Sequence, residues 1–207
     1  MVPPSPTATT ATGTPTAVAT ATASPAPTAT AIYAVAPGGS YDDWSIPDGW
    51  TAGADLATDG SSSGDAWIEP PLTIDSTSDY GIDFTFTVAS ADQCPRSFGV
   101  AIRGSDDGYY AAGFLWNCDP VIAIWANQQM LVQQPVALTD GPHQMRLQAS
   151  GSQIAVLLDG QTVLIVDDEK YPGGGEIGFW SDGVPVHISD VNVTAAQPVV
   201  AEGTPHA

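Results

Sequence analysis

The residues of this chain best suited to acid–base chemistry are its four glutamates. Cleavage of a glycosidic bond uses two carboxyl groups that flank the bond, one as the acid and the other as nucleophile or base. Side chains two or four residues apart share one face of a β-strand, and no two glutamates have that spacing, since they stand at positions 69, 169, 176 and 202. The sequence therefore lacks a same-strand pair and does not favour an enzyme. An aspartate on a neighbouring strand could still pair with Glu176, which is the one candidate catalytic residue.

Aromatic side chains point to binding more than to catalysis. In the segments 121–126 and 176–180 the aliphatic side chains alternate with a tryptophan, Trp125 in the first and Trp180 in the second. If the aliphatic face is core, both rings stand on the open face of a sheet, where they could bind the apolar faces of sugar rings. The alternative is that the segment 41–70 covers these rings, which then form only a second small core. The sequence predicts a ligand-binding surface that draws on Trp125, Trp180, Trp116 and Tyr110.

Acidic pairs beside turns suggest a further chemistry, the binding of calcium. Asp106 and Asp107 lie in a turn signal, and Asp167 and Asp168 follow an apolar run. Carboxylate oxygens at loop ends are the hard ligands that Ca²⁺ prefers, so these four residues are candidate calcium ligands. The chain has no EF-hand spacing, and ordinary solvated turns are the alternative. No other cofactor is expected, because the three histidines and two cysteines show no zinc-ligand spacing.

The two cysteines, Cys94 and Cys118, predict one disulfide bond. If the apolar segments from 83–89 to 121–126 run up and down in succession, the connections that carry the two cysteines meet at the same end of the sheet. The bond would close a loop of 24 residues and stabilise the fold by about 3 kcal/mol in the chain-entropy model. Disulfides persist in oxidising compartments, which favours a place outside the cytoplasm. The alternative is two free thiols in a reducing cytosol.

The elements that must position these residues are short strands. Six Asp-Gly pairs follow residue 40, and this dipeptide tolerates the positive φ angles of tight hairpin turns. The segment 82–88 carries a large apolar side chain at every second position, the pattern of a half-buried strand. Asp159-Gly160 joins two further strands in a hairpin. The segment 121–134 lies between two prolines and could be a helix, but its alternation favours a hairpin that turns near Asn127. The fold class is therefore all-β, an antiparallel two-sheet sandwich.

Composition divides the chain into three parts. Residues 1–38 carry no charged side chain, and 28 of the 38 are Thr, Ala or Pro, which predicts a disordered, extended linker or stalk. A disordered tail without a spacer role is the alternative. Residues 39–196 are long enough to bury one core, and residues 197–207 form a C-terminal tail. Neither a signal peptide nor an apolar run of transmembrane length is visible, and we expect the natural chain to start upstream of Met1.

The charge balance excludes one class of partner. Four Lys and Arg stand against 23 Asp and Glu, which gives a net charge of −19. A chain with so few cations cannot neutralise a run of phosphates, so nucleic-acid binding is excluded. Anionic membranes and acidic polysaccharides are disfavoured for the same reason. Self-repulsion keeps such a domain soluble and monomeric outside the cell, although adaptation to a saline environment would give the same composition.

Four stretches of the second half carry a resemblance to a known group of domains. They read GPHQMRL at 141–147, SQIAVLLDG at 152–160, YPGGGEIGFW at 171–180 and ISDVNV at 188–193. Their order of strand, Asp-Gly hairpin, Gly-rich turn, Gly-Phe strand and closing Asp-Val strand resembles the concanavalin A-like jelly-roll domains. The laminin-G-like and 3-keto-disaccharide hydrolase branches are both similar. The resemblance covers about residues 80–193, implies a jelly-roll sandwich, and adds support for calcium, which some laminin-G-like domains bind at the sandwich rim.

Three functions from different classes are open at this point. The first is an extracellular or cell-surface, non-catalytic carbohydrate-binding or adhesion module on a stalk, whose partner is a carbohydrate or cell-surface glycan. The second is a glycoside hydrolase of the keto-disaccharide type. The third is the sensory ectodomain of a longer membrane protein that binds a protein partner. The fold resemblance, the stalk and the candidate Trp face favour the first.

Overall fold

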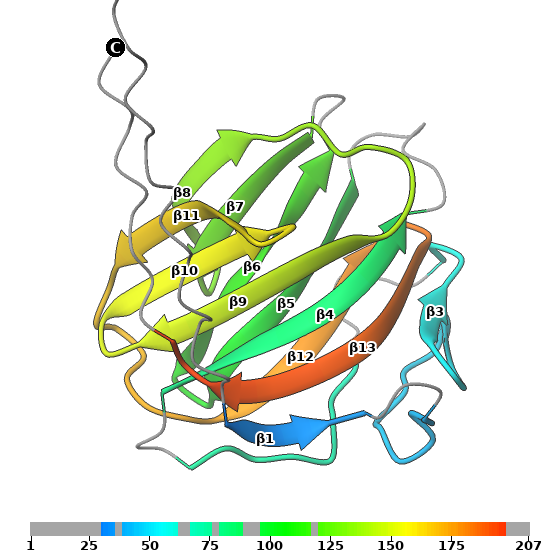
Figure 1. Cartoon of the computed structure of the whole chain (residues 1–207), viewed down its shortest axis with the longest axis horizontal. Coiled ribbons are helices and arrows are strands. Elements are labelled where there is room, and N and C mark those ends of the chain that lie inside the picture. Colours follow the sequence, from blue (N-terminus) through cyan, green and yellow to red (C-terminus); the bar gives the residue numbers. More distant parts are fainter. Residues whose placement is uncertain are drawn as a thin grey trace, which may run out of the picture.

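The computed structural model describes residues 30–35, 39–61, 67–75, 79–88, 96–116 and 120–197, although not the side chain of Trp116. Every regular element in these ranges is a β-strand (Figure 1), so the predicted all-β class is confirmed. No helix within them is long and apolar enough to cross a bilayer. The strands are β1 (Ala31–Ala34), β2 (Trp50–Ala52), β3 (Leu56–Thr58), β4 (Tyr80–Val88), β5 (Arg96–Ser105), β6 (Gly108–Trp116), β7 (Pro120–Ala126), β8 (Gln129–Pro135), β9 (His143–Ser150), β10 (Gln153–Leu158), β11 (Gln161–Asp167), β12 (Glu176–Asp182) and β13 (Val186–Ala195).

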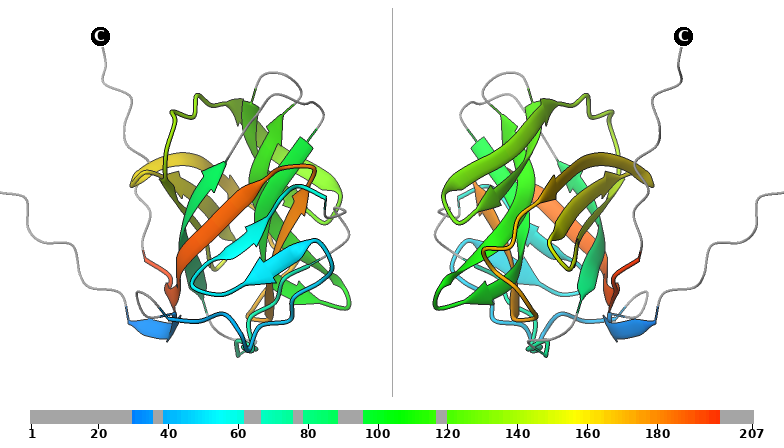
Figure 2. Two further views of the ribbon diagram at one scale, coloured as in Figure 1. Left: turned by 90° about the vertical axis from the view of Figure 1, so that its right-hand side faces the viewer. Right: turned by 90° about the vertical axis from the view of Figure 1, so that its left-hand side faces the viewer.

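The strands form two antiparallel sheets that face each other (Figures 1 and 2). The larger sheet has eight strands in the order β11-β10-β9-β4-β13-β3-β2, with β1 beside β13. The smaller sheet has five strands in the order β12-β5-β6-β7-β8. This arrangement confirms the predicted two-sheet jelly-roll sandwich.

Hairpin turns set the register of neighbouring strands. Asp159 and Gly160 have φ angles of 51° and 78° and join β10 to β11, as the Asp-Gly signal predicts. Asn127, with a φ of 52°, turns β7 into β8, so the hairpin interpretation of 121–134 is also confirmed. Asparagine tolerates this left-handed conformation, and the side-chain oxygen of Asn127 also accepts a hydrogen bond from the Tyr109 N–H at 2.9 Å.

Phenylalanine rings fill the space between the sheets. Phe84 and Phe86 on β4 meet Phe98, Phe114 and Phe179 of the opposite sheet, with ring centroids 5.0–6.2 Å apart. All five rings are no more than 2% exposed. Because burial of one such ring stabilises a fold by about 1.5–3 kcal/mol, these contacts fix which face of each strand is core. The other face of the five-stranded sheet is thereby free to carry a site.

The folded unit begins earlier in the chain than predicted. Strand β1 lies within the stretch 1–38 that the composition assigns to the linker, and it pairs with β13 at the margin of the molecule (Figure 2). Ile32, Tyr33 and Val35 cluster at this end of the stretch, whereas the other larger apolar side chains, Met1, Val2 and Val18, are scattered. The hydroxyl of Tyr33 accepts a hydrogen bond from Trp44 Nε1 at 3.0 Å, and Val35 is buried. The rest of the predicted linker, except residue 30, lies outside the described residues, as do residues 198–207.

The predicted order of neighbouring strands holds only in part. Strands β5, β6 and β7 run up and down in succession, but β4 belongs to the opposite sheet, between β9 and β13. Phe84 and Phe86 on β4 therefore face β5 across the core, where the alternation pattern alone could not place them. Cys94 and Cys118 lie outside the described residues, so their disulfide stays a prediction.

A buried arginine ties three connections together at one end of the sandwich. Arg103 is 3% exposed, and its guanidinium donates to the carbonyls of Gly151 and Tyr171 and to the Asp79 carboxylate at 2.9 Å. Its backbone N–H donates to the hydroxyl of Tyr80 at 2.7 Å, and burial raises the pKa of that hydroxyl to about 12. A buried guanidinium needs such partners, so this network fixes the chain before β4, between β9 and β10, and between β11 and β12.

Candidate functional site

The outer face of the five-stranded sheet has a floor of small residues. Ala101, Ala111 and Ala123 are at most 4% exposed, and Gly99 and Gly113 stand directly opposite each other on β5 and β6. These positions alternate with the phenylalanines and isoleucines that face the core. Because the floor has few side-chain atoms of its own, larger rings from other positions can lie down on it.

Four aromatic residues lie on this floor, and we call them the aromatic cluster: Trp67, Tyr109, Trp125 and Trp180. All four side chains are half-buried. Trp67 is the centre of the cluster, with ring centroids 5.4 Å from Trp180 and 5.2 Å from Tyr109, while Trp125 and Trp180 are 6.3 Å apart. Strand register produces the arrangement, because Trp180 pairs with Gly99 and Trp125 with Ala111.

Two glycines make room for the indole rings. A Cβ atom on Gly99 would stand 2.3 Å from Trp180 Cη2, and one on Gly178 would stand 2.7 Å from Trp67 Cε3. Real side chains do not approach so closely, since carbon atoms meet at about 3.5–4.0 Å. Any residue larger than glycine would therefore lift the corresponding ring off the sheet.

The cluster lines a pocket of about 220 Å³, which we call the aromatic pocket. Ser97, Asn127 and Gln128 add polar groups to its wall, and Ser97 Oγ accepts a hydrogen bond of 3.4 Å from Trp180 Nε1. Ring faces beside a few polar groups are the usual composition of a site for a small organic ligand.

A second pocket of about 160 Å³ adjoins the first and shares Trp67 and Tyr109 with it. Glu69 and Glu176 line this acidic pocket, and both are exposed. An isolated bridge between Ile68 and Phe179, with backbone hydrogen bonds of 2.9 Å in both directions, sets Glu69 beside β12. The two glutamates are thus brought to one end of the aromatic cluster from segments more than a hundred residues apart.

The predicted aromatic residues have different positions. Trp125 and Trp180 lie on the outer face as the alternation predicts, and Trp67 from the segment 41–70 covers part of the same face. The structure contradicts a ligand-binding role for Tyr110, which is fully buried in the core, because it shares a strand face with the core residue Phe114. Trp116 ends β6, but its side chain lies outside the described residues.

The Tyr110 hydroxyl instead holds a loop. It donates to Asp168 Oδ1 at 2.5 Å and accepts a hydrogen bond from the Tyr171 N–H at 3.1 Å. Burial and the Asp168 carboxylate raise the pKa of Tyr110 to about 12. Sequence reasoning gave a binding role to Tyr110 in place of its neighbour Tyr109 because it left open which face of β6 is core.

The candidate calcium ligands do not converge. Asp106 and Asp107 are exposed in the β5–β6 turn, Asp167 is exposed at the end of β11, and one oxygen of Asp168 is engaged by Tyr110 and by the Lys170 N–H. Among the described residues, no three His, Cys, Asp or Glu side chains are arranged to hold a metal ion.

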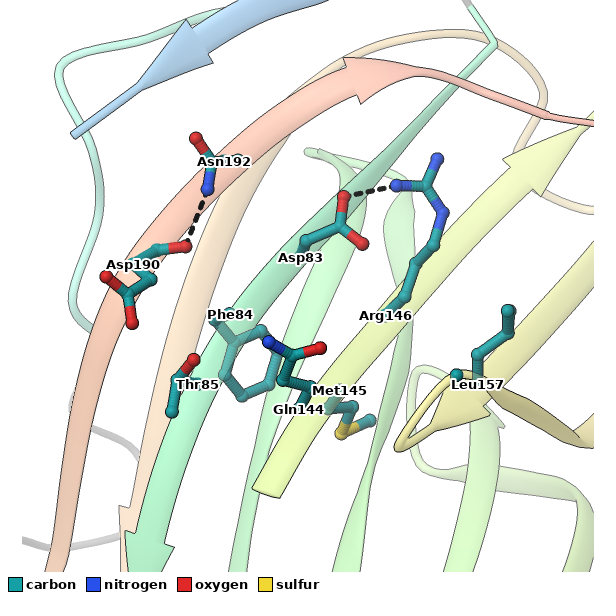
Figure 3. Close-up of a pocket in the computed structure, with 10 residues that line it drawn as sticks. Asp83, Phe84, Thr85, Gln144, Met145, Arg146, Leu157, Asp190 and Asn192 are labelled. Carbon is teal, nitrogen blue, oxygen red and sulfur yellow. Dashed lines mark hydrogen bonds and ion pairs between the residues drawn. The ribbon is translucent and has the colours of Figure 1, made fainter. Parts of the chain in front are cut away.

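A polar pocket of about 190 Å³ lies on the opposite side of the molecule, on the outer face of the eight-stranded sheet (Figure 3). Its main feature is an ion pair between Asp83 on β4 and Arg146 on β9. Burial raises the pKa of Asp83, although the Arg146 guanidinium opposes the shift. Arg146 also donates to Thr194 Oγ1 at 2.9 Å and Gln148 Oε1 at 2.8 Å. Because these groups satisfy one another, the polar pocket is the weaker candidate for a ligand site.

Sequence reasoning missed Trp67, Tyr109 and Glu69, and it also missed the polar residues of the pocket wall, Ser97, Asn127 and Gln128. Trp67 and Glu69 flank Ile68, and this three-residue alternation beside two prolines was the only local signal that they share a face. Nothing local could show that this short segment would pair with β12.

Comparison with known proteins gives relatives in structure alone. No protein-family model and no curated protein matches the sequence. Among solved structures, a Bacillus subtilis protein of unknown function with a galectin-like fold superposes with a TM-score of 0.61 at 12% identity, covering 80% of this chain and 96% of that one. The carbohydrate-binding module CBM66 of Bacillus subtilis gives 0.57 at 15% identity, with 74% and 96% covered.

A third structure is the exoplasmic/lumenal domain of VIP36 with bound Ca²⁺ and Man3GlcNAc. It superposes with a TM-score of 0.56 at 14% identity and covers 79% of this chain and 86% of that one. At such identities the likeness speaks for the fold and not for a shared ligand. The chain shares the jelly-roll fold of these structures, the fold that the sequence resemblance implies.

Proposed function

We propose that the protein is a non-catalytic carbohydrate-binding module whose ligand lies in the aromatic pocket. The observation that carries the proposal is the aromatic cluster on the outer face of the five-stranded sheet, seated on glycines 99 and 178. Its half-buried rings offer apolar faces to a sugar, while Ser97, Asn127 and Gln128 stand beside them for its hydroxyls. That two structural relatives are a carbohydrate-binding module and a domain with bound Man3GlcNAc supports the same function.

The proposal includes an extracellular or cell-surface location, with the Thr-, Ala- and Pro-rich stretch as a stalk. The composition of that stretch and the Cys94–Cys118 disulfide that we expect both support an oxidising compartment. Its test is a mass measurement of the two cysteines, after alkylation of free thiols, in protein isolated from its natural host. Two alkylated thiols would contradict the location.

A glycan array probed with the full chain, with and without calcium, tests the binding function. The matched variants are Trp125→Ala, which removes a ring of the cluster, and Ile32→Ala, which removes a 43% exposed apolar side chain on β1, outside both pockets. We expect selective glycan signal that Trp125→Ala abolishes and Ile32→Ala leaves intact. A blank array would overturn the proposal and direct attention to a protein partner. Loss of signal in the calcium-free arm would assign calcium a role.

One observation favours a second candidate, hydrolysis of a glycoside. Glu69 and Glu176 line the same pocket, and a pair of carboxyl groups across neighbouring strands is what such an enzyme needs. The test is release of reducing sugar from a broad panel of glycosides by the wild type and by Glu176→Gln. Release by the wild type that the variant loses would establish an enzyme, and no release across the panel would exclude this candidate.

A further inference from the structure

The rings of the aromatic cluster form an open box more than a flat platform. The planes of Trp67 and Trp180 meet at 50°, those of Trp67 and Tyr109 at 67°, and those of Trp125 and Trp180 at 79°. A row of coplanar rings would suit a flat polysaccharide chain. Four rings at steep angles that line one pocket cannot all stack on a flat chain, and an electron-rich ring face that borders the pocket attracts a compact cation.

The charges around the box have one sign. Glu69 and Glu176 line the acidic pocket that adjoins it, and no lysine, arginine or histidine occurs among the described residues that line either pocket. Neither glutamate takes part in an ion pair within the described residues. The site therefore offers two carboxylates to a ligand and no cation.

Three of the four lysines and arginines are engaged elsewhere, and the fourth, Arg96, lines neither pocket. Arg103 pairs with Asp79, and Arg146 pairs with Asp83 on the eight-stranded sheet. The ammonium group of Lys170 lies 5.2 Å from the centre of the Tyr171 ring. With a net charge of −19 over the whole chain, the potential at the aromatic pocket is negative and repels acidic sugars.

We infer that the ligand of this site is an oligosaccharide of unacetylated 2-amino sugars, held by its ammonium group between the aromatic box and the carboxylates of Glu69 and Glu176. The inference rests on the proposed carbohydrate-binding function and names its ligand class. The ammonium charge is attracted by the ring faces and by the two carboxylates. The pyranose ring lies on an indole, and Ser97, Asn127 and Gln128 bond its hydroxyls. N-acetylation removes the charge and so removes both attractions.

Calorimetric titration of the full chain with three oligosaccharides of equal length tests this assignment: glucosamine, N-acetylglucosamine and glucose oligomers of the same linkage. We expect the glucosamine oligomer to bind at least about tenfold more tightly than the other two. The preference falls with added salt, and it disappears when the pH is raised until the amine loses its proton. Free choline and lysine serve as cations without a pyranose ring.

Variants of three exposed carboxylates test whether the preference for the amino sugar comes from Glu69 and Glu176. Glu69→Gln and Glu176→Gln each weaken glucosamine binding about threefold and leave the affinity for the neutral oligomers unchanged. Asp182→Asn removes the same charge from the same strand but lines neither pocket, so its affinity equals that of the wild type.

Each other outcome contradicts a defined part of the argument. Equal affinity for all three oligomers overturns the inference and leaves the proposed function standing. Choline or lysine binding as tightly as the amino sugar overturns the assignment to a sugar. No binding of any oligomer, together with a blank glycan array, overturns both the inference and the proposed function.

Discussion

The packing of the Trp67 ring against Gly178 can be tested with a variant that adds a single carbon atom at position 178. In Gly178→Ala the new Cβ would stand 2.7 Å from Trp67 Cε3, while the next nearest atoms are 3.5 Å and 3.6 Å away. The only serious overlap is thus with the edge of one side chain and amounts to about 1 Å. The indole has to move by about that distance, which alters its contact with the Trp180 ring, whose centroid is 5.4 Å away.

The loss of stability in Gly178→Ala depends on how freely the Trp67 ring can move aside. Overpacking a closed core costs about 1–3 kcal/mol, but Trp67 is half-buried and can swing toward solvent. We therefore expect the lower end, about 1 kcal/mol, which lowers Tm by about 2–4 °C in a domain of this size. Coupling between the two indoles depends on their separation and angle, so the near-UV circular dichroism of the variant differs from that of the wild type.

The matched control is Gly53→Ala. A Cβ there has no heavy atom within 4 Å, and the φ of Gly53 lies outside the left-handed region. Its free energy of unfolding stays within about 0.5 kcal/mol of the wild type, with an unchanged near-UV spectrum. If Gly178→Ala also kept the near-UV spectrum and the Tm of the wild type, the Trp67 ring would not pack against Gly178 as described.

Two further predictions concern stability. Both ring nitrogens of His143 face acceptors, Asp159 Oδ2 at 2.8 Å and the Thr139 carbonyl at 2.9 Å. Burial lowers the pKa of His143, but these two hydrogen bonds outweigh burial and raise the pKa above 6.5. The stabilisation from protonated His143 is complete below pH 6.5 and is lost as the pH rises through the raised pKa. The Tm of the wild type therefore falls over that pH range, and the Tm of His143→Gln does not. Parallel curves of Tm against pH for the two proteins would contradict this. Asp79→Asn leaves the buried Arg103 guanidinium without its anion. Because Asp79 is itself 45% exposed, we expect the free energy of unfolding, measured in urea, to fall by about 1–3 kcal/mol. A loss no larger than that of the surface variant Asp182→Asn would show that the Arg103–Asp79 pair contributes nothing.

Much of the fold could be predicted because its signals are local. Alternation fixed the strand character of 82–88, and Asp159-Gly160 and Asn127 identified two hairpin turns. The sheet to which β4 belongs is a non-local property, decided by its pairing with β9 and β13. Strand β1 was missed because its four residues follow a long stretch without a core pattern, and its pairing partner is more than 150 residues away.

The site could be predicted only where a residue sits on a regular strand. Trp125 and Trp180 alternate with buried isoleucine and phenylalanine, so their outward direction follows from period two. Trp67 and Glu69 reach the site through one isolated bridge at Ile68, and a single pair of backbone hydrogen bonds leaves no periodic pattern in the sequence.

The glycines of the five-stranded sheet link the local strand pattern of the sequence to the non-local contacts of the site. Glycine inside a strand loses chain entropy on folding without packing a side chain, so Gly99 and Gly178 on neighbouring strands need a compensating role. Each lies under an indole that comes from another strand or segment, and the ring fills the space that the missing side chain leaves. Gly99 and Gly178 thus mark where indole rings lie on the outer face of this sheet, even though Trp67 arrives from a distant segment.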